Sequence, residues 1–193
     1  MKSFKILSII TLTVLFLTAC GRSHNVKVNL TPDELEGAQQ EIALLNKSIA
    51  NFVPPTKGEI AWRDMIDLSK AYEKLGDMDK AIKIYTDVLD KGDKTKAIIN
   101  NLGRLYEEVG EYDLAVKQYQ RLVDEYNDTG YLYDITWAYI HAAQAKKGDE
   151  AISYRKEAEK AFNAWQLTFQ KTDEQTQQAI GDLREKEKAN PAD

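Results

Sequence analysis

Cys20 is the one cysteine in the chain of 193 residues, and His24 and His141 are the two histidines. A thiol can serve as a nucleophile beside a base, as a metal ligand beside other cysteines and histidines, or as the attachment point of a covalent group. One cysteine and two separated histidines do not make the ligand set of a zinc site. We therefore expect no metal site, no disulfide, and covalent modification as the chemistry of Cys20.

The acidic residues show no catalytic pair. Glu107 and Glu108 are adjacent in a segment of helical periodicity, so their side chains point about 100° apart and are typical of solvated charges. His141 lies late in a predicted helix, with no nucleophile suggested beside it. The sequence contains no glycine-rich phosphate loop, no G-x-S-x-G and no H-E-x-x-H. We expect a protein that is not an enzyme and needs no cofactor.

The overall charge is negative. The chain carries 26 basic and 31 acidic side chains, a net charge of -5, and 43% of its residues are hydrophobic. This balance is typical of a globular protein. A surface of this sign repels DNA and RNA, so nucleic acid is not an expected partner.

Residues 1–19 have the pattern of a secretory signal peptide. Lys2 and Lys5 precede residues 6–17, which carry no charge, and Thr18 and Ala19 follow at once. In a helix, residues 6–17 would span about 18 Å, less than the roughly 30 Å core of a bilayer. The segment therefore indicates export and disfavours a membrane-spanning anchor.

The end of this segment, Leu17-Thr18-Ala19-Cys20, resembles the lipobox of bacterial lipoproteins. The resemblance implies that Cys20 becomes the first mature residue and carries lipid, such as palmitate, on its sulfur and amine. Several acyl chains hold a protein firmly on a membrane. Gly21, where inner-membrane retention would favour Asp, implies the outer membrane if the organism has one. An ordinary signal peptide with an incidental cysteine is the alternative.

The mature chain is thus expected in the cell envelope, facing the periplasm or the cell exterior. Residues 20–30 lack helical periodicity and are predicted to form a lipidated tether with His24 solvated.

Residues 68–88 recur as residues 102–122, with a constant offset of 34 positions. On both sides of a glycine the apolar residues recur at three and four positions, which predicts two amphipathic helices per unit. The matched pairs are Met65/Ile99, Leu68/Leu102, Tyr72/Tyr106, Gly76/Gly110, Ala81/Ala115, Tyr85/Tyr119 and Val88/Leu122.

The glycine, alanine and tyrosine of each unit have predicted structural roles. The glycine is predicted to end the first helix in a left-handed conformation. Ala81 and Ala115 should let the helices approach, and Tyr85 and Tyr119 should fill the space between hairpins. A 34-residue period with these residues resembles the tetratricopeptide repeat (TPR), which implies a short all-α solenoid with two regular units at 60–129.

Helical caps are expected at both ends. Residues 31–52 are predicted to be an N-terminal capping helix, residues 130–171 a degenerate third unit with a C-terminal cap, and residues 172–193 a polar helical tail. The apolar seam of 31–52 would alternatively pair with a second copy, so a homodimer stays open.

In TPR arrays the first helix of each unit lines a concave groove. The resemblance therefore implies a partner-binding surface with a basic first half and an aromatic end. A solvated face is the alternative for Lys70 and Arg104, and core packing is the alternative for Trp137. The expected groove residues are Arg63, Ile66, Lys70, Lys74, Asn100, Arg104, Glu107, Tyr133 and Trp137.

The combined expectation is a membrane-anchored scaffold or adaptor outside the cytoplasm that binds a protein or peptide. Similar lipoproteins act in envelope or pilus assembly, which is an analogy and does not identify the partner. A glycan-binding or enzyme-accessory lipoprotein and a self-associating structural spacer are the alternatives.

Overall fold

The computed structural model describes residues 23–52, 62–92 and 95–189, and within these ranges the chain is all-α. A short 3-10 helix, η1 (Thr129–Tyr131), precedes the sixth α-helix. The predicted fold class, a short all-α solenoid, is confirmed. The helices are α1 (Pro32–Asn51), α2 (Trp62–Lys74), α3 (Met78–Asp90), α4 (Lys96–Glu108), α5 (Tyr112–Tyr126), α6 (Leu132–Ala145), α7 (Gly148–Phe169) and α8 (Glu174–Ala189).

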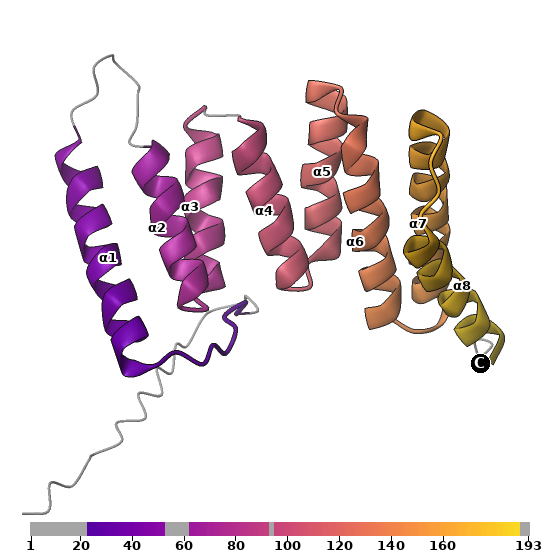
Figure 1. Cartoon of the computed structure of the whole chain (residues 1–193), viewed down its shortest axis with the longest axis horizontal. Helices are drawn as coiled ribbons and strands as arrows, with labels where there is room; N and C mark the ends of the chain where they lie inside the picture. The colour runs from indigo at the N-terminus through magenta and orange to yellow at the C-terminus, as the bar shows by residue number, and fades with distance from the viewer. Residues whose placement is uncertain (1–22, 53–61, 93–94, 190–193) are drawn as a thin grey trace, which may run out of the picture.

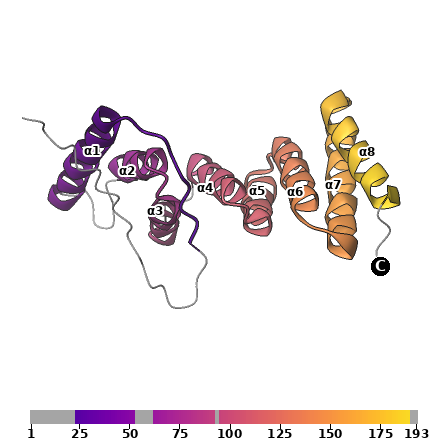
Figure 2. The same cartoon turned by 90° about the horizontal axis from the view of Figure 1, so that it is seen from below.

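The helices stand side by side in a row (Figure 1). Short turns join α2 to α3, α4 to α5 and α6 to α7, and each pair packs as a hairpin. Helix α1 packs along α2 at one end, and α8 packs on α7 and α6 at the other. Figure 2 shows α2, α4 and α6 on one side of the row and α3 and α5 on the other. We call the first side the α2–α4–α6 face.

The opening of α1 follows the sequence signals at its start. The Thr31 side chain accepts the N–H of Glu34, while the Glu34 carboxylate accepts the N–H of Thr31 at 2.9 Å, and Pro32 occupies the first turn. Only Ala38 is buried along the helix. Its apolar seam faces α2, where Ile49 packs against the core of the first repeat.

A glycine ends the first helix of both regular units. Gly76 and Gly110 have φ angles of 74° and 79°, a region that side chains disfavour. Each N–H donates to the carbonyl three residues earlier, at 2.8 and 3.0 Å. Asp77 then caps α3 by accepting the N–H of Lys80. The predicted left-handed turns are confirmed.

One tyrosine per repeat fills the space between neighbouring hairpins. Tyr85 has no exposed surface, packs among residues of α2, α3 and α4, and accepts a hydrogen bond from Asn101 Nδ2 at 3.2 Å. Tyr119 is almost fully buried and stacks on Tyr131 of the next unit, with ring centroids 6.1 Å apart. Both matched alanines are fully buried beside them. The roles predicted for these residues are confirmed.

Gly103 makes room for the second of these tyrosines. A Cβ atom added at Gly103 would lie 2.7 Å from Cε1 of Tyr119, too close for any real contact. The corresponding residue in the first repeat is Ser69, whose buried hydroxyl donates to the carbonyl of Ala81 at 3.0 Å. Small residues at this position allow the two helices of a hairpin to approach.

The polar tail predicted at 172–193 differs from the observed α8. Thr176, Ile180 and Leu183 are buried on one stripe of this helix, and the two apolar residues join the core that α6 and α7 share. Arg155 of α7 pairs with Glu187 of α8, and this contact raises the pKa of Arg155. The helix is a docked cap because three positions, spaced four and three apart, are enough to bury one side of it.

We predict that Gly103→Ala lowers the free energy of unfolding by about 1–3 kcal/mol, because the new methyl group displaces the buried Tyr119 ring. Chemical denaturation of the full chain measures the change. Gly37→Ala in α1 is the matched control, since nothing lies within 4 Å of its added Cβ. It should stabilise the protein by about 0.5–1 kcal/mol through helix propensity alone. Equal effects of the two substitutions would contradict the packing argument.

Candidate functional site

The predicted lipid attachment site, Cys20, lies outside the described residues, and the structure begins three positions after it, at Ser23. Within the described ranges, no helix has the length and apolar character needed to cross a bilayer. The part of the chain nearest to Cys20 is residues 23–30, which lack regular secondary structure and which we call the strap.

The strap lies against the turns of the first two repeats. The N–H of Val26 donates to the carbonyl of Gly76 at 2.9 Å, and the Val26 side chain packs on the first hydrophobic core. Ser23 donates to Asp79, in the first turn of α3, at 3.3 Å. These contacts place the start of the described chain at the ends of α2 and α3 where Gly76 turns the chain.

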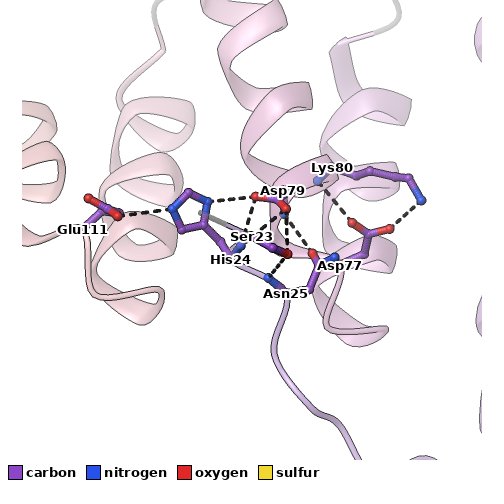
Figure 3. A network of polar contacts seen from close by, with 7 residues as sticks. All are labelled: Ser23, His24, Asn25, Asp77, Asp79, Lys80 and Glu111. Carbon is purple, nitrogen blue, oxygen red and sulfur yellow. Dashed lines mark hydrogen bonds and ion pairs between the residues drawn. The ribbon is translucent and has the colours of Figure 1, made fainter. Parts of the chain in front are cut away.

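His24 joins two consecutive repeats (Figure 3). Its Nδ1 lies 2.8 Å from Asp79 Oδ1, and its Nε2 lies 3.3 Å from Oε1 of Glu111, the residue that caps α5. Both ring nitrogens therefore face carboxylate oxygens. The doubly protonated imidazolium can donate to both, whereas a neutral ring can donate to only one.

The prediction that His24 is solvated was wrong. The imidazole is 23% exposed, and its partners lie 55 and 87 positions away along the chain. Asp79 and Glu111 sit at helix N-termini, where acidic residues are expected for local electrostatic reasons alone. The sequence therefore held no sign that they also bind a distant histidine.

The predicted groove residues belong to α2, α4 and α6, as three consecutive sets. The basic ones are exposed, whereas Ile66, Asn100, Glu107, Tyr133 and Trp137 are partly buried. Ile66 packs against the first core, so part of its surface is structural. By helix, the residues are Arg63, Ile66, Lys70 and Lys74 on α2, Asn100, Arg104 and Glu107 on α4, and Tyr133 and Trp137 on α6.

Arg104 links the first two units. Its guanidinium pairs with Glu73 of α2 and with Glu108 one turn along α4, the latter at 3.0 Å. Partial burial acts against the charge, but the two carboxylates hold the pKa of Arg104 above its ordinary value. Lys70 pairs with Asp67 on its own helix, at 3.7 Å.

Glu107 makes the corresponding link between the second and third units. Its carboxylate accepts a hydrogen bond from the Tyr119 hydroxyl at 3.1 Å and lies 2.7 Å from Nδ1 of His141 on α6. The His141 ring in turn contacts Trp137, with centroids 5.6 Å apart. Glu107, predicted as a groove residue, is therefore also a bridge within the solenoid.

Asp134 was not predicted as a site residue. It is partly buried on α6, one turn before Trp137, and it belongs to none of the ion pairs formed among the described residues. Burial raises the pKa of its carboxyl, and the negative charges of Glu107 and Asp128 raise it further. Its position three residues before a groove aromatic was the available sequence signal.

One surface hollow is lined by the α4–α5 turn and includes Glu111. Others lie away from the predicted groove residues. One, of about 330 Å³, is lined by the α6–α7 turn and the end of α8, including Ala143, Lys147, Ile152, Leu183 and Lys186. Within the described ranges, no group of three or more histidine, cysteine, aspartate or glutamate side chains is placed to hold a metal ion.

The strap contacts generate a prediction with an internal control. Gly76→Ala and Gly110→Ala should both lose stability, by roughly 1–2 kcal/mol, because both positions are left-handed. Only the methyl group at Gly76 meets the strap, 2.2 Å from the carbonyl oxygen of Val26. Hydrogen exchange at Val26 should therefore rise in Gly76→Ala and stay unchanged in Gly110→Ala. Equal protection of Val26 in the two variants would show that the strap is not held at this turn.

Comparison with known proteins places the repeats in a family. Residues 65–97 and 98–130 each match the family model described as "Tetratricopeptide repeat". A crystal structure of a tetratricopeptide repeat protein from Parabacteroides merdae ATCC 43184 is similar, with a TM-score of 0.56 and 21% sequence identity. The match covers 80% of this chain and 55% of that protein, so the chain spans about half the length of its structural relative. No curated protein matches the sequence. Residues 65–130 therefore match two tandem tetratricopeptide repeats, and the helices on either side extend them into an all-α, TPR-like helical solenoid.

Proposed function

We propose that the chain is a lipid-anchored, non-enzymatic scaffold outside the cytoplasm, which binds a protein or peptide on its α2–α4–α6 face. Tetratricopeptide repeats generally mediate interactions between proteins. The observation that carries the proposal is the composition of this face. Exposed basic side chains on α2 and α4 lead to partly buried aromatic residues on α6. Arginine and aromatic side chains are the usual anchors of protein interfaces.

The face is also preorganised for binding. The pairs Arg104–Glu73 and His141–Glu107 connect its three helices side chain to side chain. A partner that binds across all three helices therefore meets groups already held in place, and less conformational freedom is lost on binding.

The strap supports the anchoring half of the proposal. Ser23 is three residues from Cys20, a distance of at most about 10 Å in a fully extended chain. Lipid on Cys20 would keep the Gly76 turn near the membrane surface. The α2–α4–α6 face runs along the sides of the helices, away from that turn, and would stay open to partners in the aqueous compartment.

The anchoring half is tested by Cys20→Ser. We expect the variant to fold with unchanged helicity and to move from the membrane fraction to the soluble fraction after cell lysis, because the acyl chains supply the membrane affinity. Fractionation with immunoblotting and circular dichroism measure the two properties. A variant that stays on the membrane after a high-salt wash would mean that Cys20 is not the anchor.

The binding half is tested by Arg104→Gln combined with Trp137→Ala. We expect loss of the partner that crosslinks to the native protein in cells, since the pair removes one charged and one aromatic contact from the face. The matched control, Lys117→Gln with Leu114→Ala, makes the same kinds of change at exposed positions of α5. The control should keep the partner. Equal capture by both variants would exclude the α2–α4–α6 face.

A further inference from the structure

Aromatic rings run along the C-terminal part of the α2–α4–α6 face and onto α7. The centroids of His141 and Trp137 are 5.6 Å apart, those of Tyr133 and Trp165 are 5.1 Å apart, and those of Trp165 and Phe169 are 5.8 Å apart. Tyr133 and Trp137 are one helical turn apart on α6, so they lie on the same side of that helix. We call these five residues the aromatic row.

The aromatic row is a surface as well as part of the core. Trp137 and Trp165 pack against the third hydrophobic core on one side, yet both keep some exposed surface. The two ends of the row are the most exposed, with the His141 side chain 40% and Phe169 39% exposed. A series of rings that keeps exposed surface along its length is typical of an interaction site.

Two carboxylates lie beside the row, one at His141 and the other on α6 near Tyr133 and Trp137. Glu107 contacts His141 directly, and Asp134 lies on α6 one turn before Trp137. Burial raises the pKa of Tyr119, whose hydroxyl donates to Glu107 at 3.1 Å, and the negative charges of Glu107 and Asp134 raise it further. No lysine or arginine pairs with either one among the described residues, since the nearby Arg104 is paired with Glu73 and Glu108.

The carboxylates of Glu107 and Asp134 beside the aromatic row favour a partner with a basic side chain. Glu107 pairs with the partly exposed His141, whereas Asp134 has no ion-pair partner among the described residues. Trp137 lies between them, because its ring contacts His141 and it follows Asp134 by one helical turn. A basic side chain placed over Trp137 would be attracted by both carboxylates and would make a cation–π contact with the ring. An apolar neighbour of that basic residue would continue toward Trp165 and Phe169.

We propose that the aromatic row binds an extended segment of a partner protein in which a lysine or arginine is adjacent to an aromatic or large aliphatic residue. The inference rests on the proposed function, because it specifies what the α2–α4–α6 face recognises. An acidic segment is repelled by the same two carboxylates, and a purely apolar segment gains nothing from them.

A peptide array tests this preference. The full chain in mild detergent is applied to an array of random-sequence peptides, and dissociation constants of the selected peptides are measured by fluorescence polarisation. We expect the selected peptides to contain adjacent basic and apolar residues. Changing the basic residue of a selected peptide to glutamine should raise Kd about tenfold, the size of effect that one desolvated charged contact has.

Protein variants locate the contact. Asp134→Asn should raise Kd about tenfold for the basic peptide and leave Kd for its glutamine version unchanged. Glu107→Gln should act in the same direction, but it also alters a bridge within the fold, so Asp134→Asn decides the question. The matched control, Asp124→Asn at an exposed position of α5, should leave both values unchanged.

The possible failures are distinguishable. If selected peptides lose affinity in Trp137→Ala but contain no basic residue, or bind Asp134→Asn as well as the unaltered protein, the basic-partner inference is wrong and the scaffold proposal survives. If no peptide is selected, or if Trp137→Ala binds every selected peptide normally, both are wrong. A glycan or a second copy of the chain that shields Trp137 from fluorescence quenching, while peptides do not, would likewise overturn both.

Discussion

The packing of one tyrosine per repeat between neighbouring hairpins determines the arrangement of the whole row of helices. Tyr85 packs on residues of its own hairpin and of α4, and Tyr119 stacks on Tyr131 of the following unit. A single helix pair cannot bury its apolar side alone, so each hairpin depends on the next. The absence of a side chain at Gly103 lets Tyr119 enter. The alignment of α2, α4 and α6 on one side of the row follows from this spacing.

The two ends of the row are closed by different means. At one end α1 buries a single residue, Ala38, against α2. At the other end α8 buries three side chains and adds an ion-pair network in which Arg155 contacts Glu159 and Glu187. Charged contacts of this kind, shielded from solvent, fix one geometry of approach better than they add stability. The C-terminal cap is therefore the better defined of the two, and it also supports Tyr133, whose hydroxyl donates to Asp173 at 3.2 Å.

The sequence was sufficient for the features that repeat. The 34-residue offset placed both glycine turns, both buried alanines and both tyrosines, because each follows from helix geometry and local sterics. The sequence was insufficient for contacts between segments that are far apart along the chain, because no repeating pattern of residues marks those segments. His24 meets Asp79 and Glu111, 55 and 87 positions away, and no local pattern marks such a pair. The buried stripe of α8 has only three residues, which lie among many polar ones in the sequence. Asp134 differs from the other carboxylates near it in having no ion-pair partner among the described residues, which only the structure shows. The contacts that the predicted groove residues make, above all Arg104 with Glu73, needed the structure.

The strap also imposes an order of events. Its residues leave the ribosome before either repeat, yet one of its partners, Glu111, is made 87 positions after His24. The contacts of the strap with Gly76 and Asp79 need only the first repeat, whereas the contact between His24 and Glu111 cannot form until the start of α5 has been synthesised and brought beside α3. The same imidazole therefore registers two stages of folding, because one ring nitrogen finds its partner when the first repeat forms and the other only when the second repeat has packed on it.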